Sequence, residues 1–119
     1  MATILVVEDE KPLRDFLVFF LEGAGHRVLQ AISGQHALLL VAEERPDLVL
    51  SDIMMPLLSG VELCRQLKAA QDTRAIPVIL MSAVGWGGEP AFEDTGANAY
   101  LDKPFSLDAL EALVRRWTQ

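Results

Sequence analysis

Short apolar runs recur along the chain, and polar or turn-forming residues follow each of them. Runs of roughly four to eight apolar residues bounded in this way are typical of strands buried on both faces. We predict four such strands and a further, less apolar strand between the first two. The five ranges are 4–7, 27–31, 48–51, 78–81 and 99–102.

Between these runs, apolar residues recur three and four positions apart, which is the spacing of one helix face. A first-turn proline or a capping serine marks each helix start, at Pro12, Ser33, Ser59 and Ser106. The first helix should stop at Gly23 or Gly25, and Pro46 ends the second helical segment. The predicted inward positions are Leu13, Leu17, Phe20, Leu21, Ala37, Leu40, Val41, Leu63, Leu67, Ala70, Leu107, Leu110, Val114 and Trp117.

The stretch between the last two strands breaks this pattern, because glycines crowd it on both sides of Trp86. A glycine in a helix interior costs up to about 1 kcal/mol relative to alanine. We therefore expect a short fourth helix over residues 90–95. Trp86 is either an exposed anchor for a partner or a cover for the apolar contacts of its own loop.

The first helix departs from the pattern in another way. Phe16, Val18 and Phe19 add apolar surface outside its inward stripe. A helix that is apolar on all sides is normally buried, so we hypothesise a docking surface or a homodimer surface there.

Strands and helices alternate five times, which favours an α/β layer fold with a parallel sheet. A length of 119 residues fits one domain. We expect residues 1–119 to form a single domain with no output domain attached.

Composition and charge narrow the function classes. The longest unbroken apolar stretch, residues 16–21, is far shorter than the roughly 20 residues that a membrane span needs. No basic segment precedes a long apolar core at the N-terminus, so no signal peptide is visible. The net charge of −7 argues against direct binding of nucleic acid, and the single cysteine, Cys64, fits a reducing compartment. We expect a cytoplasmic protein without membrane contact.

The polar residues that follow the strands carry the candidate chemistry. Glu8 and Asp9 follow the first strand, and Asp52, Ser82 and Lys103 follow three others. In an open parallel sheet, the carboxyl ends of the strands form the ligand site. Three carboxylates at one edge repel one another unless a cation neutralises them, and their hard oxygen atoms suit Mg²⁺. The pattern therefore indicates a magnesium site.

Asp52 is the candidate nucleophile at this edge. A carboxylate oxygen can attack phosphorus and form an aspartyl phosphate. Lys103 and the metal would neutralise charge on the phosphoryl oxygens, and Ser82 would donate a hydrogen bond to one of them. Each residue alone would be an ordinary surface residue, whereas the combination points to phosphoryl chemistry.

Four segments together resemble the receiver domains of bacterial two-component response regulators. They are Glu8-Asp9, residues 52–60 (DIMMPLLSG), Ser82-Ala83 and residues 96–105 (GANAYLDKPF). The resemblance covers the whole chain. It implies a flavodoxin-like, doubly wound, five-stranded parallel sheet of order 2-1-3-4-5 with five helices, the fourth short or irregular.

The same resemblance implies a set of roles. Asp52 would be the phosphoacceptor of a phosphorelay, fed by a sensor histidine kinase or a phosphotransfer protein. Ser82 and Lys103 would contact the phosphoryl oxygens, and Tyr100 would turn inward on activation. The Lys103–Pro104 bond would be cis, and the ligands of Mg²⁺ would be Glu8, Asp9, Asp52 and the carbonyl of Met54. Such a protein is a switch that assists its own phosphorylation and dephosphorylation, and we do not class it as an enzyme.

Three other functions are weighed against this one. An aspartate-nucleophile phosphatase usually carries a second aspartate two positions after the first, where this chain has Met54. A flavin-binding module of this fold would need a phosphate loop rich in serine and threonine after the first strand, where the acids lie. A degenerate receiver that acts only as a protein-interaction module fits the glycine-rich fourth-helix region but not the intact Asp52, Ser82 and Lys103.

Overall fold

A computed structural model of the chain describes residues 2–55, 57–82 and 95–118. Five parallel strands form one sheet in the order β2-β1-β3-β4-β5. They are β1 (Thr3–Val7), β2 (Arg27–Ala31), β3 (Leu48–Asp52), β4 (Val78–Ser82) and β5 (Ala99–Asp102). The strand order and the parallel pairing confirm the flavodoxin-like, doubly wound arrangement.

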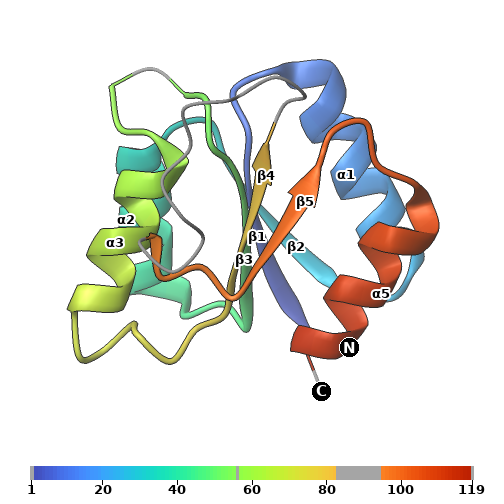
Figure 1. Cartoon of the computed structure of the whole chain (residues 1–119). Helices are drawn as coiled ribbons and strands as arrows, with labels where there is room; N and C mark the ends of the chain where they lie inside the picture. Colours follow the sequence, from blue (N-terminus) through green and yellow to red (C-terminus); the bar gives the residue numbers. More distant parts are fainter. Residues whose placement is uncertain (1, 56, 83–94, 119) are drawn as a thin grey trace.

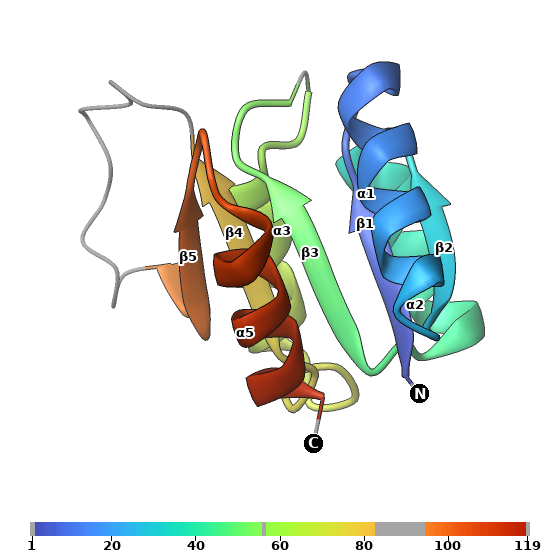
Figure 2. The ribbon, with the colours of Figure 1, turned by 90° about the vertical axis from the view of Figure 1, so that its right-hand side faces the viewer.

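Helices cover both faces of the sheet (Figure 1). They are α1 (Lys11–Gly23), α2 (Gly34–Glu44), α3 (Gly60–Ala69) and α5 (Leu107–Trp117). Helices α2 and α3 cover one face, and α1 and α5 cover the other, where Figure 2 shows them in front of the strands. The predicted serine caps are confirmed, because the hydroxyls of Ser33, Ser59 and Ser106 each accept a hydrogen bond from a backbone N–H in the first turn.

Side chains alternate along each strand between two apolar cores. Leu48 and Leu50 of β3 belong to the core under α1 and α5, whereas Val49 belongs to the core under α2 and α3. Both cores contain fully buried leucines, and burial of such a side chain contributes about 2–3 kcal/mol. The sheet is therefore held from both sides, and its strand ends are fixed relative to one another.

Two predicted inward positions are wrong. Ala70 is exposed, because α3 ends at Ala69 and Ala70 has already left the helix with an extended backbone. Leu107 is 45% exposed, because the first turn of α5 lies at the margin of the core. The expected fourth helix and Trp86 lie outside the described residues, except for Thr95.

The outer face of α1 carries two exposed phenylalanines, as the sequence indicates, next to the exposed ion pair of Lys11 and Asp15. Phe16 is 43% exposed and Phe19 is 79% exposed.

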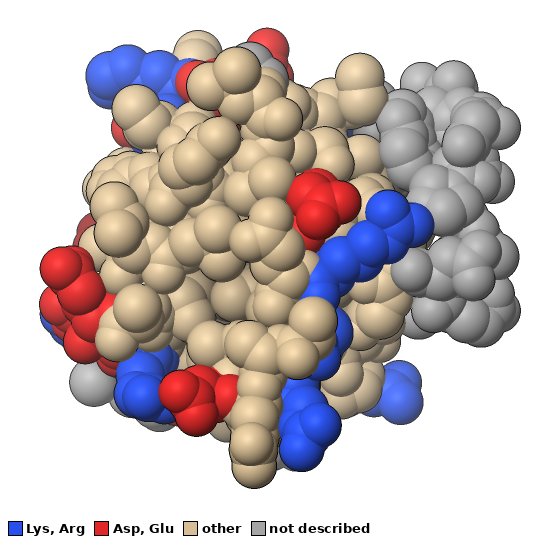
Figure 3. Space-filling view, turned by 90° about the vertical axis from the view of Figure 1, so that its left-hand side faces the viewer, with Lys and Arg blue, Asp and Glu red and all other residues tan. Residues whose placement is uncertain are grey.

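In the part of the chain that the structure describes, no helix is both long enough and apolar enough to cross a membrane. The side that carries α2 and α3 shows a broad uncharged area with charged groups of both signs around it (Figure 3).

Candidate functional site

The predicted site residues gather at the carboxyl ends of the strands. Asp52 is the last residue of β3, and Ser82 is the last residue of β4. Glu8 directly follows β1, and Lys103 directly follows β5. Since β1, β3, β4 and β5 are consecutive neighbours in the sheet, all four residues reach one edge.

Strand alternation divides these residues between the two faces of the sheet. Glu8, Asp52 and Lys103 each lie two positions after a residue of the α1–α5 core, namely Val6, Leu50 and Leu101. The three charged side chains therefore project from the same face of the sheet, the one covered by α1 and α5, which explains why they meet. Ser82, Tyr100 and Asp102 continue the other face, in line with Leu80.

A tight backbone turn fixes the position of Asp52. The Gly60 N–H donates to the Ile53 carbonyl at 2.9 Å, so the chain folds back on itself between β3 and α3. A Cβ atom on Gly60 would lie 2.1 Å from the Asp52 carbonyl oxygen, which is closer than two non-bonded atoms can approach. Only glycine lets α3 begin this close to the strand end. Asp52 is buried, and its side chain is 7% exposed.

Three carboxylates share the site, as predicted. Ligand oxygens of Glu8, Asp9 and Asp52 all lie within 4.8 Å of one another. Glu8 is fully buried, whereas Asp9 is exposed. Burial raises the pKa of Glu8 to about 7, and the nearby charge of Asp52 adds to the rise. The backbone N–H of Glu10 donates to Glu8 Oε2 and opposes the rise.

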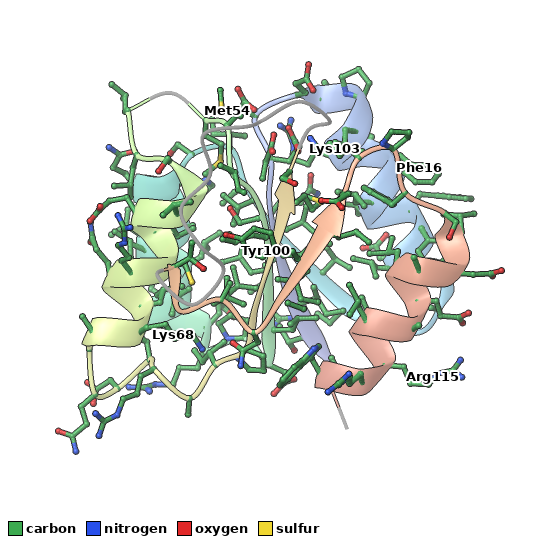
Figure 4. The ribbon with its side chains drawn as sticks, in the orientation of Figure 1. Phe16, Met54, Lys68, Tyr100, Lys103 and Arg115 are labelled. Atoms are coloured by element: carbon green, nitrogen blue, oxygen red, sulfur yellow. The ribbon has the colours of Figure 1, made fainter. Side chains whose placement is uncertain are left out.

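Lys103 supplies the positive charge at this edge. Its Nζ lies 3.2 Å from Asp52 Oδ2 and 3.7 Å from Glu8 Oε1. Its side chain is 21% exposed, so the ammonium group remains open to an incoming anion. The Lys103–Pro104 peptide bond is cis, as the resemblance implies. Figure 4 shows Lys103 and Met54 at the same edge of the molecule.

The donor set fits Mg²⁺. Glu8 Oε1 is buried and makes no hydrogen bond to any described residue, although it lies among other carboxylate oxygens. A buried oxygen without a hydrogen-bond partner is unfavourable unless a cation binds it. Hard oxygen ligands that leave room for water and phosphate are those that Mg²⁺ prefers.

Met54 lies in the segment that follows β3 and Asp52. Its side chain is 57% exposed, so the thioether lies on the surface and only the backbone is a candidate ligand. The carbonyl of Met54 as a ligand therefore stays a prediction.

Ser82 is close to the site, but its hydroxyl is directed elsewhere. It is 7% exposed and donates a hydrogen bond to Asp102 Oδ1 at 3.0 Å. The backbone N–H of Lys103 also donates to the Ser82 carbonyl at 2.7 Å. The ends of β4 and β5 are therefore joined directly next to the charged cluster.

Sequence reasoning missed two residues near the site. The sequence predicts Asp102 only as the last residue of a strand, because its contact with Ser82 depends on the register of β4 and β5. The guanidinium of Arg14 donates to the Glu8 carbonyl at 2.9 Å and fixes the backbone of the acid pair to α1. Arg14 lies on the helix that directly follows these acids, which is the signal that could have identified it.

Comparison with known proteins gives one consistent family. A family model described as "Response regulator receiver domain" matches residues 4–115. The phosphate regulon transcriptional regulatory protein PhoB of Pseudomonas aeruginosa is 40% identical over 96% of this chain and 52% of its own length. The KDP operon transcriptional regulatory protein KdpE of Escherichia coli is 40% identical over 97% of this chain and 50% of its own length. The chain thus spans about half the length of these relatives.

Solved structures agree with this result. A putative response regulator from Chloroflexus aurantiacus superposes with a TM-score of 0.91 at 31% identity, covering 98% of this chain and 97% of that one. The chemotaxis response regulator CheY4 of Vibrio cholerae superposes with a TM-score of 0.86 at 27% identity, covering 98% of each chain.

Proposed function

Because the chain belongs to the response regulator receiver domain family of two-component systems, we propose that it accepts a phosphoryl group on Asp52. The main support for the proposal is the burial of the Asp52 carboxylate together with the charged groups around it. Asp52 is nearly buried, it has an ammonium group at 3.2 Å, and two further carboxylates lie beside it. Proteins of this family are signalling switches rather than metabolic enzymes, and they typically use Mg²⁺.

The reaction follows from the positions of these groups. A carboxylate oxygen of Asp52 forms a bond to phosphorus while the bond from phosphorus to a histidine nitrogen of the donor breaks. That nitrogen keeps the electron pair and takes a proton from water. Lys103 neutralises charge on the phosphoryl oxygens, which is favourable because the neighbouring Asp52 and Glu8 are buried.

Glu8, Asp9, Asp52 and the carbonyl of Met54 would hold Mg²⁺. When bound, the ion supplies the charge that reduces repulsion between the carboxylates and the phosphoryl oxygens. The buried Glu8 oxygen without a hydrogen-bond partner supports this assignment. The same groups would assist later attack by water on the aspartyl phosphate, so the protein would take part in its own dephosphorylation.

Signal output would follow from a change of partner for Ser82. Its hydroxyl would turn towards a phosphoryl oxygen, and Tyr100, on the same face of the neighbouring strand, would fill the vacated space. Tyr100 is half buried and packs against the core under α2 and α3, which supports this role. Phosphorylation would thus shift an existing equilibrium between two arrangements.

The proposed setting is the cytoplasm, with a sensor histidine kinase or a phosphotransfer protein as the donor. We propose that residues 1–119 act as a single receiver domain, and the net charge of −7 supports signalling without direct contact to nucleic acid. The docking or homodimer surface on α1 stays a prediction. It fails if Phe19→Lys changes neither the sedimentation coefficient nor the rate of phosphotransfer.

Intact-mass spectrometry tests the main proposal. The chain is incubated with acetyl phosphate and Mg²⁺ beside Asp52→Asn. We expect the mass of one phosphoryl group on the wild type, none on the variant and none when EDTA is present at the start. If a series of small phosphodonors gives no adduct, the chain is a receiver that acts only by binding other proteins.

A further inference from the structure

We propose that Asp102 is a positioning residue that holds the Ser82 hydroxyl away from the phosphoryl site and so restrains the switch before phosphorylation. This inference rests on the proposed function. It concerns a residue outside the charged cluster, and it assigns a role to a hydrogen bond between the ends of the last two strands.

The geometry of β4 and β5 brings the two side chains together. Ser82 and Asp102 are register partners in neighbouring parallel strands, and both are the last residues of their strands. Side chains at paired positions share a face of the sheet, so the hydroxyl and the carboxylate lie side by side. Ser82 Oγ and Asp102 Oδ1 are 3.0 Å apart. The backbone hydrogen bond from the Lys103 N–H to the Ser82 carbonyl holds the two strand ends at this spacing.

The proton of the hydroxyl makes this contact exclusive. A serine hydroxyl carries one proton and can direct it to one acceptor at a time. While the Ser82 hydroxyl donates to Asp102 Oδ1, it cannot also donate to a phosphoryl oxygen near Asp52. The two acceptors lie on different faces of the sheet by strand alternation, so the hydroxyl must rotate from one to the other.

The charge of Asp102 strengthens the restraint. A carboxylate is a stronger hydrogen-bond acceptor than a neutral oxygen, and the distance of 3.0 Å from the Ser82 hydroxyl to Asp102 Oδ1 is that of an ordinary hydrogen bond. Lys103, the adjacent residue, directs its ammonium group to Asp52 and Glu8 instead. Among the described residues, Ser82 is the only hydrogen-bond partner of the Asp102 side chain. The Asp102 carboxylate therefore acts on Ser82 and not on the charged cluster.

The consequence is a measurable change in rate. Removal of the Asp102 carboxylate frees the hydroxyl to stabilise the phosphoryl oxygens in the transition state. Asp102 is exposed, which limits the strength of its bond in water. We expect about a fivefold increase in the rate of phosphorylation, which is the effect of one ordinary hydrogen bond.

The test uses the full chain and the initial rate of phosphorylation by acetyl phosphate, read by intact mass. The variants are Asp102→Ala, Asp102→Asn, Ser82→Ala and the double variant Ser82→Ala with Asp102→Ala. Asp72→Ala is the matched control, because it removes an exposed carboxylate from the turn after α3, outside the site. We expect Asp102→Ala to be about fivefold faster than wild type and Asp72→Ala to be unchanged. Asp102→Asn should lie between wild type and Asp102→Ala, since its amide oxygen still accepts a weaker hydrogen bond.

The double variant separates positioning from general electrostatics. If Asp102 acts through Ser82, Asp102→Ala has no effect in the Ser82→Ala background. An equal acceleration in both backgrounds would mean that Asp102 only repels the anionic donor, and the proposal would be wrong. An unchanged rate for Asp102→Ala, with a wild type that is phosphorylated, also overturns it. A wild type that takes up no phosphoryl group from any donor overturns the proposed function, and this inference with it.

Discussion

A lysine lies at each end of the parallel strands, one at the carboxyl ends and one at the amino ends. One of them is surrounded by carboxylates and the other by uncharged oxygen atoms. Lys103, at the carboxyl ends of the strands, faces the carboxylates of Asp52 and Glu8. Lys68, on α3, lies at the amino-end edge and donates to three uncharged oxygens. Figure 4 shows the two side chains at opposite ends of the sheet.

The surroundings of Lys68 are those of a structural contact. Its Nζ lies 2.8 Å from the Ile76 carbonyl, 2.8 Å from Asn98 Oδ1 and 3.2 Å from the Arg74 carbonyl. Its three protons therefore all have acceptors. Asn98 Oδ1 also accepts the backbone N–H of Val78, which joins α3 to the starts of β4 and β5. Burial without a carboxylate partner lowers the pKa of Lys68.

The comparison separates the lysine that we propose to contact a phosphoryl group from one that makes only structural contacts. Uncharged acceptors satisfy every proton of Lys68 and leave it nothing further to bind. Around Lys103, the carboxylates keep spare lone pairs, and one buried oxygen of Glu8 makes no hydrogen bond among the described residues. An incomplete set of partners, rather than the presence of a charge, distinguishes the edge where we propose that a ligand binds.

The largest expected effect comes from Lys103→Met. Loss of the ammonium group leaves the phosphoryl charge less neutralised, and we expect the rate of phosphorylation to fall by about 10²- to 10³-fold. The measurement is the initial rate with acetyl phosphate, read by intact mass. Lys68→Met is the matched control and should keep at least half of the wild-type rate. A similar loss in both variants would contradict the comparison.

A second pair of variants compares the glycines of the two edges. Gly60→Ala would drive a Cβ into the Asp52 carbonyl oxygen, and we expect a loss of about 3 kcal/mol in the free energy of unfolding. Gly96→Ala meets only the flexible Lys68 side chain, but its φ of +79° strains any side chain, so about 1–2 kcal/mol should be lost.

Urea denaturation measures both losses. Gly23→Ala is the control, because its Cβ would have no neighbour within 4 Å and alanine favours the helix. If Gly60→Ala is as stable as Gly96→Ala, the turn after β3 is looser than its geometry indicates.

Lys68→Met should reduce stability and leave phosphorylation nearly unchanged. Three hydrogen bonds are lost and their acceptors are left partly unpaired, but the site is half open to water. We expect a loss of about 2 kcal/mol in the free energy of unfolding. Lys11→Met is the control, since Lys11 lies on the surface in an exposed pair with Asp15. Equal urea concentrations at the unfolding midpoints of the two variants would contradict the structural role of Lys68.

The smallest effect is a dependence of Mg²⁺ binding on pH. Glu8, with a pKa of about 7, must lose its proton before it can bind a cation. The association constant for Mg²⁺ should fall by up to about tenfold for each pH unit below 7 and level off above it. Isothermal titration calorimetry between pH 5.5 and 8 measures this slope. Glu8→Gln should bind more weakly and lose most of the slope, and an unchanged slope would exclude Glu8 as its source.

The raised pKa of Glu8 also determines how the free energy of unfolding depends on pH when no metal is bound. The folded protein keeps a proton on Glu8 at pH values where the unfolded chain has lost it. The free energy of unfolding should therefore decrease as the pH rises from the ordinary range of a glutamate towards 7. Glu8→Gln should remove this decrease in urea denaturation at a series of pH values.

Local patterns predicted most of the fold. The strand ranges needed only one-residue extensions at three strands, and the serine caps were visible as sequence signals. The errors at Ala70 and Leu107 lie at helix ends, where periodicity continues past the last packed turn. Glu8, Asp52 and Lys103 were predictable as neighbours, because parallel strands bring their carboxyl ends to one edge.

The contacts that sequence reasoning missed depend on register and long-range pairing. The hydrogen bond from Ser82 to Asp102 requires both the order of β4 and β5 and their exact alignment. Lys68 and Asn98 lie thirty positions apart and meet only because α3 packs beside the start of β5. No local pattern encodes either contact, since each side chain alone is an ordinary polar residue.

Strand alternation makes the two helical layers separable for protein engineering. Glu8, Asp52 and Lys103 continue the face under α1 and α5, whereas Ser82, Tyr100 and Asp102 continue the face under α2 and α3. A designer could replace outer residues of α2 and α3 to create a new recognition surface without altering a side chain of the charged cluster. Exchange of the whole of α3 would not leave the site intact, because Gly60 at its start lies against the Asp52 carbonyl oxygen, so the changes would have to stay at the outer positions of the layer.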